Sequence, residues 1–307
     1  MKKPLVVFLV LAFGLSWAVA LPLWFGGGLG SPLTTGMATL MMFTPTAGVL
    51  GAWALTRAPF RQWARETGLT LGERKGRTGR YVLGTWIGVP LLILAALVLS
   101  VAAGLMTLDL DGLGLLREAY ESRGAPVPGD LGQVLTLQFV LGAVAGPLLN
   151  AIPALGEEWG WRGWLLPRLV AAKGVLPGLL LSGVIWGLWH APLTLLGYNY
   201  PRLGSWAALY FVGFCVLAGV LFGWLRLRTG SVWPAVVAHG SLNAVAPGVL
   251  LLGDPASPPN EVLVGITGLV GWVLLAVVGA LLLRFAPARP PAPPAPREPA
   301  PTTEPAV

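Results

Sequence analysis

The sequence has few charged residues for its size. Only 11% of its 307 residues are Asp, Glu, Lys or Arg, whereas 55% are apolar. An average soluble domain carries about 25% charged residues, and this chain has too few to cover the surface of a water-soluble body. The composition therefore argues against a soluble enzyme, a disordered regulator or a nucleic-acid-binding protein. It predicts a polytopic membrane protein instead.

Cysteine and histidine are also scarce. Cys215 is the single cysteine, so the chain can form no internal disulfide and no zinc knuckle. Because Cys215 lies inside an apolar run, we interpret it as a small buried hydrophobic residue. The two histidines, His190 and His239, both lie in apolar segments as well.

Apolar runs of about 20 residues, the length that crosses roughly 30 Å of hydrocarbon, occur eight times. They cover residues 4–25, 36–55, 81–106, 131–155, 174–196, 203–225, 231–252 and 262–283. The sequence thus predicts an all-α transmembrane bundle of about eight spans within residues 1–285. Residues 286–307 are dominated by Pro and Ala, and we expect them to form a disordered cytoplasmic tail.

Basic residues are distributed unevenly between the predicted loops. With the N-terminus placed in the cytoplasm, the inner segments hold 17 of the 20 Lys and Arg residues. The outer segments hold three, Arg117, Arg123 and Arg202. This split agrees with the positive-inside rule and with an even number of spans. We expect a multi-pass protein of the cell membrane with both termini in the cytoplasm, and the Arg-, Ala- and Gly-rich composition points to a bacterial inner membrane.

Two adjacent acids, Glu157 and Glu158, follow 26 uncharged residues. On a helix, Glu158 and Arg162 are four residues apart, so they share a face and can pair. Glu157 points about 100° away from Glu158. The spacing predicts a structural ion pair between Glu158 and Arg162 and leaves Glu157 free to act on another group. The alternative is an interfacial cluster that only ends a span.

Two further polar groups lie inside predicted spans. Trp186 lies one turn before His190 and can pack against the imidazole, and His239 and Asn243 share a helix face. Taken alone, each group has a structural alternative, a hydrogen-bonded histidine or a contact between helices. Together, a carboxylate, two imidazoles and an amide are the groups that activate water and stabilise an oxyanion.

Counting residues along these spans places the two histidines at different depths. His190 lies roughly 24 Å into its span and His239 about 12 Å into its own, at 1.5 Å per residue. We therefore expect the fourth helix to run on through Arg162, with residues 163–173 forming a cytoplasmic turn. Three tryptophans beside the acids are expected to anchor this segment at the membrane interface, with a lateral gate as the alternative: Trp159, Trp161 and Trp164.

The order of these motifs resembles that of the CPBP family, the intramembrane proteases of the CAAX-prenyl-protease and bacteriocin-immunity type, also called the Abi family. The family pattern is Glu-Glu-x-x-x-Arg, then Phe-x-x-x-His, then His-x-x-x-Asn/Asp. It corresponds here to residues 157–162, 186–190 and 239–243, with Trp186 in place of Phe. The resemblance implies a helical bundle with a polar cavity open to the cytoplasmic side.

The resemblance also implies a role for each residue of the cavity. Glu157 would act as the general base, or as a metal ligand, on a water molecule that it shares with His190. His239 and Asn243 would hold the developing oxyanion.

Outside the reaction itself, Glu158 and Arg162 would order the first motif. Glu157, His190 and His239 are three ligands that suit a catalytic Zn²⁺ with water in the fourth position. A metal-independent mechanism remains open at this point.

Three functions compete on these observations. The first is an intramembrane endopeptidase that cuts a membrane-borne protein or peptide by activated water. The second is a non-catalytic immunity or binding protein of the same fold. The third is a proton-coupled transporter, because intramembrane Glu and His also relay protons. The expected partners are the lipid bilayer and a membrane-borne substrate, with no nucleic acid; the oligomeric state stays open.

Overall fold

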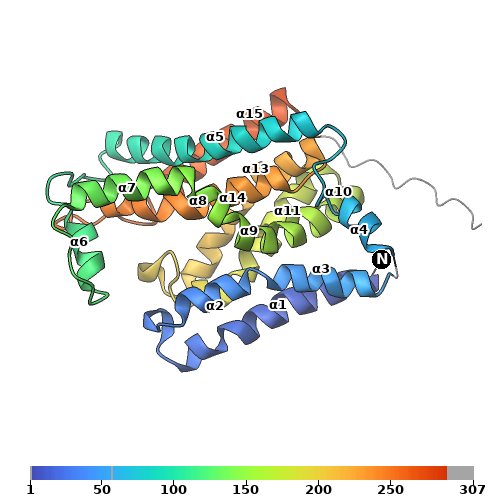
Figure 1. The fold of residues 1–307 in the computed structure, drawn as a ribbon, viewed down its shortest axis with the longest axis horizontal. Coiled ribbons are helices and arrows are strands. Elements are labelled where there is room, and N and C mark those ends of the chain that lie inside the picture. The colour runs from blue at the N-terminus through green and yellow to red at the C-terminus, as the bar shows by residue number, and fades with distance from the viewer. Residues whose placement is uncertain (1, 57, 289–307) are drawn as a thin grey trace, which may run out of the picture.

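The computed structural model describes residues 2–56 and 58–288, and every regular element of these residues is a helix (Figure 1). In chain order they are α1 (Lys2–Phe25), η1 (Gly28–Gly30), α2 (Thr34–Met41), α3 (Thr44–Ala54), α4 (Phe60–Glu66), α5 (Lys75–Ala102), α6 (Gly114–Glu121), α7 (Leu131–Val144), α8 (Gly146–Leu149), α9 (Ala151–Glu158), η2 (Trp159–Leu165), α10 (Leu166–Lys173), α11 (Val175–Trp189), α12 (Ala191–Thr194), η3 (Pro201–Leu203), α13 (Trp206–Thr229), α14 (Trp233–Val249), η4 (Leu250–Leu252) and α15 (Leu269–Phe285). Apart from its first three residues, the predicted tail lies outside the described part of the chain.

Eight apolar helical segments coincide with the eight predicted spans. Five are long and apolar enough to cross a membrane: Lys3–Phe25, Thr34–Ala54, Lys75–Ala102, Trp206–Thr229 and Trp233–Leu252. Three shorter apolar helices, α7, α11 and α15, complete the set. The prediction of a polytopic helical bundle is confirmed, whereas the exact number of spans stays a prediction.

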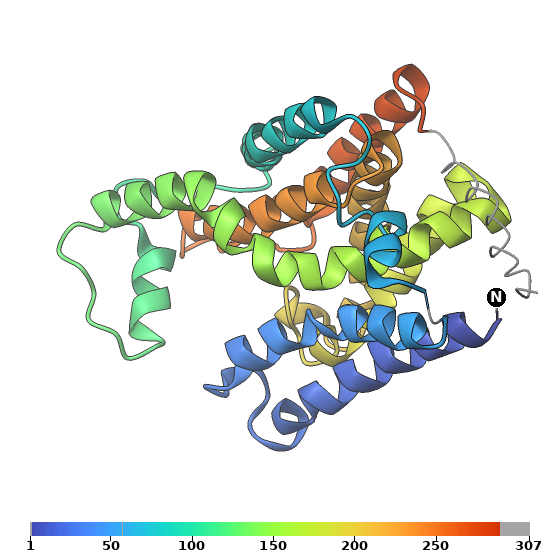
Figure 2. The ribbon, with the colours of Figure 1, turned by 45° about the vertical axis from the view of Figure 1, so that its right-hand side comes forward.

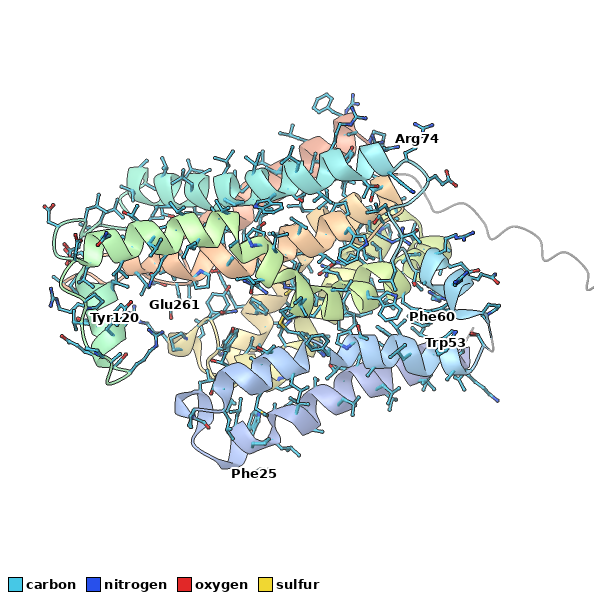
Figure 3. All side chains as sticks on the ribbon, viewed as in Figure 1. Phe25, Trp53, Phe60, Arg74, Tyr120 and Glu261 are labelled. Carbon is cyan, nitrogen blue, oxygen red and sulfur yellow. The ribbon has the colours of Figure 1, made fainter. Side chains whose placement is uncertain are left out.

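The long helices run back and forth between two ends of the bundle (Figure 1). The N-terminus, α4 and the C-terminal end of α15 lie at one end, which Figure 3 marks with Arg74. We call this the terminal end. The opposite end, called the far end below, carries α6 and the loops around Tyr120 and Glu261 (Figure 3). The inner and outer loops of the predicted topology thus fall at the terminal and far ends, respectively.

The motif-bearing helices occupy the middle of the bundle. Figure 2 shows α1, α2 and α3 along one side and α5 and α15 along the other, with α9, α11, α13 and α14 between them. Gly183 and Gly187 let α11 approach α13 closely, because a Cβ atom at either position would lie within 2.6 Å of the Cα of Val216 or Val212. Small residues at such crossings are typical of helix packing in membranes.

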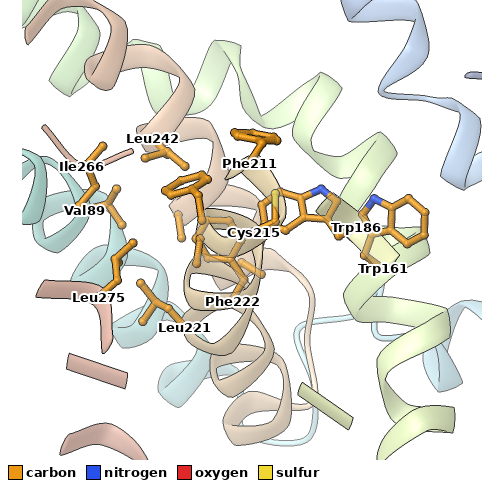
Figure 4. Close-up of a cluster of buried hydrophobic side chains, with 14 of the residues drawn as sticks. Val89, Trp161, Trp186, Phe211, Cys215, Leu221, Phe222, Leu242, Ile266 and Leu275 are labelled. Carbon is orange, nitrogen blue, oxygen red and sulfur yellow. The ribbon is translucent and has the colours of Figure 1, made fainter. Parts of the chain in front are cut away.

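A cluster of aromatic and aliphatic side chains fills the space between these helices. Figure 4 shows Phe211, Cys215 and Phe222 of α13 gathered around Trp186 of α11. The side chain of Cys215 is fully buried, which confirms its interpretation as a small buried hydrophobic residue. These side chains form the apolar surroundings in which the polar groups of the motifs must find partners.

The segment after the acid pair differs from the prediction. The helix does run on through Arg162, as expected, but residues 163–173 form no turn: the chain stays helical to Lys173, through the π-helix η2 and then α10. Leu166 and Val170 hold this stretch in place by packing against Leu179 of α11. The break between α10 and α11 is the single residue Gly174, which caps α10 and has a backbone φ of +86°.

The fifth predicted span, residues 174–196, is also shorter in the structure. Helix α11 ends at Trp189, and His190 is its C-terminal cap rather than an interior residue. The short helix α12 begins at Ala191, and Pro192 is its second residue. Because proline has no N–H to donate to the preceding turn, a continuous helix through this point is disfavoured.

The three tryptophans expected at the membrane interface lie inside the bundle instead. Trp161 and Trp164 are fully buried, and Trp159 is 8% exposed. Phe8 of α1 stacks on Trp164 with ring centroids 4.6 Å apart and meets Trp161 edge to face at 5.6 Å. The anchoring interpretation is therefore wrong, because Trp161 and Trp164 pack against α1 and Trp159 donates a hydrogen bond to Oγ1 of Thr67 inside the bundle.

The far-end loop of residues 107–130 contains the short helix α6. Asp109 orders the entry to this helix, because its carboxylate accepts the backbone N–H groups of Gly114 at 2.9 Å and Gly112 at 2.7 Å. These hydrogen bonds to the charged form lower the pKa of Asp109 below its usual value.

Candidate active site

Both acids of the pair are buried at the end of α9. Glu157 is 2% exposed and Glu158 is fully buried. Glycines flank the pair: a Cβ at Gly156 would lie 2.7 Å from the carbonyl oxygen of Met42, and one at Gly160 would lie 2.4 Å from the Cβ of Pro45. The pair is therefore pressed against the junction of α2 and α3, and the π-helix η2 begins directly after it. Such π-helical turns are frequent at functional sites.

Glu158 is the centre of a buried charged network. Its Oε1 atom lies 2.9 Å from a guanidinium nitrogen of Arg162 and 2.9 Å from Nδ1 of His239. The predicted ion pair is present, and His239 is a third member that spacing alone did not connect. The Arg162 guanidinium also lies over the ring of Trp186, 4.1 Å from its centroid. A buried guanidinium is thus held by a carboxylate and an aromatic face.

Glu157 points away from this network and meets Trp186 of α11. The indole Nε1 of Trp186 donates a hydrogen bond of 2.7 Å to Oε2 of Glu157. The sequence predicted only that Trp186 would pack against His190, and its ring does so, edge to face, with centroids 5.5 Å apart. The bond to Glu157 was missed. Its signal was the departure from the family pattern, since an indole carries an N–H donor and a phenyl ring does not.

The two imidazoles are held in different ways. Nδ1 of His190 lies 2.9 Å from the carbonyl oxygen of Trp186, and Nδ1 of His239 faces the Glu158 carboxylate. Since both partners only accept hydrogen bonds, Nδ1 carries the proton in each ring. The Nε2 atom of each ring is then available for other contacts. Aromatic rings fix the first imidazole, with Trp189 and Phe211 each 4.7 Å away edge to face.

One cavity of about 330 Å³ joins these groups. Glu157, His190, His239 and Asn243 all line it, whereas Glu158 and Arg162 lie behind its wall. The structure therefore brings four of the six predicted residues to a single polar cavity and places the other two as support. Further polar residues of the lining were not predicted, because they lie outside the motifs: Thr34, Thr35, Thr39, Asn150, Tyr198, Asn199 and Thr267.

The position of the cavity bears on the predicted topology. Its lining comes from α2, the segment after α12, the first half of α13 and the second half of α14, all toward the far end of the bundle (Figure 1). The sequence predicted cytoplasmic termini and, by resemblance, a cavity open to the cytoplasm. The cavity thus lies toward the end of the bundle opposite to the start of α1 and the end of α15, and the side of the membrane that it faces stays a prediction.

The donor set was also expected to suit Zn²⁺. Glu157, His190 and His239 are ligand types that zinc takes. Among the residues that the structure describes, however, no three His, Cys, Asp or Glu side chains are grouped closely enough to hold one ion. In this arrangement the three residues do not fit a bound zinc, and the expectation of a metal stays a prediction.

Comparison with known proteins points to the same region. Residues 136–245 match the family model of type II CAAX prenyl endopeptidases, Rce1-like. All three motifs lie within this match. A stretch of 100 residues is also 28% identical to CAAX prenyl protease 2 of Methanococcus maripaludis. These matches support a CPBP-family protease. This alignment covers 31% of this chain and 37% of that protein, so the chain matches little more than a third of its relative's length.

Proposed function

We propose that the chain is an intramembrane endopeptidase that hydrolyses a peptide bond of a membrane-associated protein or peptide. The observation that carries the proposal is the Glu157 carboxylate, which is buried, oriented by Trp186 and exposed only to the cavity that it shares with two imidazoles. A buried carboxylate in an apolar bundle is costly unless it has a task or a partner. The matches to CAAX prenyl proteases support the same reaction class.

In the proposed reaction, Glu157 and Nε2 of His190 hold a water molecule in the cavity. Glu157 takes a proton from this water as the oxygen attacks the carbonyl carbon of the substrate peptide bond. The carbonyl oxygen becomes an oxyanion, which accepts hydrogen bonds from Asn243 and from Nε2 of a protonated His239. Glu158 lies against His239, where its charge compensates that of the imidazolium.

The second half of the reaction returns the proton. The carboxylic acid of Glu157 donates it to the amide nitrogen of the tetrahedral intermediate, and the C–N bond breaks. Glu157 is again ionised, and the products are a carboxylic acid and an amine, which become a carboxylate and an ammonium when the acid gives its proton to the amine. No step of this sequence passes through a metal ion.

The direct test is Glu157→Gln in proteoliposomes with a membrane-anchored peptide. We expect the cleavage rate to fall by about 10²–10⁴-fold, the usual contribution of a general base. Glu66→Gln is the matched control, because Glu66 lies on α4 away from the cavity, where it accepts a hydrogen bond from Gln62. Undiminished cleavage by Glu157→Gln would rule out the proposed base. Metal analysis of the active wild-type sample then decides whether Zn²⁺ accompanies activity.

We also propose that the terminal end faces the cytoplasm. The uneven split of basic residues supports this orientation, which directs the cavity toward the opposite side of the membrane. Cys215 is buried, so a single introduced cysteine reports its own position. Ser122→Cys in the far-end loop should react with an impermeant thiol reagent on intact cells. Gln62→Cys should react only after the cells are opened; the reverse pattern would overturn the orientation.

A further inference from the structure

A second and larger groove lies outside the candidate active site. It has a volume of about 1070 Å³ and is formed by α5, α13 and α15 at the terminal end of the bundle. Figure 1 shows α5 and α15 on the side of the bundle opposite to α1–α3, with α13 toward its middle. The groove shares no lining residue with the catalytic cavity. Its volume is at the upper end of the range for small-molecule sites.

One end of this groove is strongly basic. Arg74, Arg77 and Arg80 from the start of α5 and Arg228 from the end of α13 all line it. In the described part of the chain, no acidic residue lines the groove and none of these four arginines belongs to an ion pair. Four arginines without a counter-charge form a site for an anionic group.

The remainder of the groove is apolar and hollow. Val89, Leu92 and Leu282 contribute to its walls. Gly84 and Gly88 line the same groove from one face of α5, and a Cβ atom at either position would meet nothing within 4 Å. The groove thus contains open space where the helix has no side chains, rather than a packed interface.

Aromatic side chains mark the boundary between the two parts. The rings of Tyr81 and Trp224 lie 5.5 Å apart beside the arginines, and the indole of Trp224 donates to the carbonyl oxygen of Ala286. Tyr and Trp with this amphipathic placement are typical of the headgroup level of a membrane. From Arg80 to Leu91 the groove extends for about 16 Å along α5 at 1.5 Å per residue, roughly half the thickness of the hydrocarbon core.

We propose that this groove binds an anionic phospholipid from one leaflet of the membrane. The arginines contact the phosphate of the headgroup, Tyr81 and Trp224 lie at the level of the glycerol, and an acyl chain occupies the space above Gly84 and Gly88. A neutral phospholipid offers the same chains but no net charge for the arginines. The preference for an anionic headgroup therefore distinguishes this site from general contact with lipid.

Native mass spectrometry of the full chain released from mixed micelles of phosphatidylglycerol and phosphatidylcholine tests the proposal. Wild-type protein should retain phosphatidylglycerol in preference to phosphatidylcholine. Arg77→Gln with Arg80→Gln should reduce that preference roughly thirtyfold, given the contribution of each basic residue near an anionic headgroup. Gly88→Leu fills the groove and should reduce retention of both lipids.

Two control variants separate the site from general effects. Arg61→Gln with Arg65→Gln removes two exposed charges from α4 at the same end of the bundle, outside the groove. Gly14→Leu adds the same side chain in open space on α1. Neither control should change lipid retention. Equal losses in the groove variants and their controls, or no preference in the wild type, would overturn the proposal; thermal unfolding of each variant confirms that it is folded.

Discussion

Glu157 and Glu158 are neighbours in the chain, yet they lie in two different regions of the bundle. Glu158 belongs to a closed region, where Arg162 and His239 contact the same carboxylate oxygen. Glu157 faces the open region, where the cavity begins and Trp186 is its hydrogen-bond donor. Because consecutive residues of a helix point about 100° apart, the two identical side chains have different surroundings. The protein compensates the charge of Glu158, whereas Glu157 faces the cavity.

The same division separates the two imidazoles. His239 is backed by a carboxylate, which suits a ring that carries positive charge, whereas His190 is backed by a backbone carbonyl, which suits a neutral ring. In the proposed mechanism, the closed region therefore supplies a charged donor to the cavity and the open region supplies an acceptor. An oxyanion and a water molecule require these two opposite properties.

The largest expected effect on stability comes from breaking the closed region. Glu158→Gln leaves the buried guanidinium of Arg162 without its counter-charge and should lower the free energy of unfolding by about 3–5 kcal/mol. Glu157→Gln keeps an oxygen that accepts from Trp186 and should cost about 1 kcal/mol or less. Chemical unfolding in detergent micelles measures both, and equal losses in the two variants would contradict the division.

The next largest expected effect tests the role of Trp186 in the open region. Trp186→Phe restores the family residue but removes the hydrogen bond to Glu157, which should lower kcat by about 10- to 100-fold, equivalent to 1.5–3 kcal/mol for a bond to a charged group. KM should be unchanged, because Trp186 orients the base rather than the substrate. Trp86→Phe is the control, since it loses an indole bond to the carbonyl oxygen of Ala143 outside the cavity. A rise in KM with kcat unchanged would show that Trp186 only shapes the cavity.

The smallest effect concerns the packing of α11 against α13. Gly187→Ala places a Cβ 2.6 Å from the Cα of Val212 and forces α11 away from α13. We expect a loss of about 1–3 kcal/mol in the free energy of unfolding, as for overpacked interiors. Gly14→Ala, where a Cβ meets nothing within 4 Å, should leave stability equal or slightly higher. Equal changes in the free energy of unfolding for the two variants would show that the close approach of α11 to α13 does not limit the size of residue 187.

The membrane bundle was predictable from the sequence because hydropathy and span length act locally. Each apolar run is recognisable without knowledge of its neighbours, and all eight appear as helices. The residues at which the helices end were less predictable. Residues 163–173 contain Gly163, Pro167 and two basic residues, which indicate a turn, but burial of Leu166 and Val170 against another helix keeps them helical.

The candidate site was predictable where partners are one helical turn apart. The Glu158–Arg162 pair follows from spacing alone, and the structure contains it. The contacts of Trp186 with Glu157 and of His239 with Glu158 join residues that are 29 and 81 positions apart. Such contacts depend on how helices cross, which a single sequence does not contain. The side on which the cavity lies depends on the same crossings.

The central claim is that Glu157 and His190 act on one water molecule in one cavity. Single-turnover cleavage by Glu157→Gln, by His190→Asn and by the double variant tests it most directly, because residues that act as a unit have non-additive effects. The account predicts that the double variant is slower than Glu157→Gln by no more than a factor of about three. A double variant whose loss equals the product of the two single losses would show that the two residues act independently and would contradict the shared site.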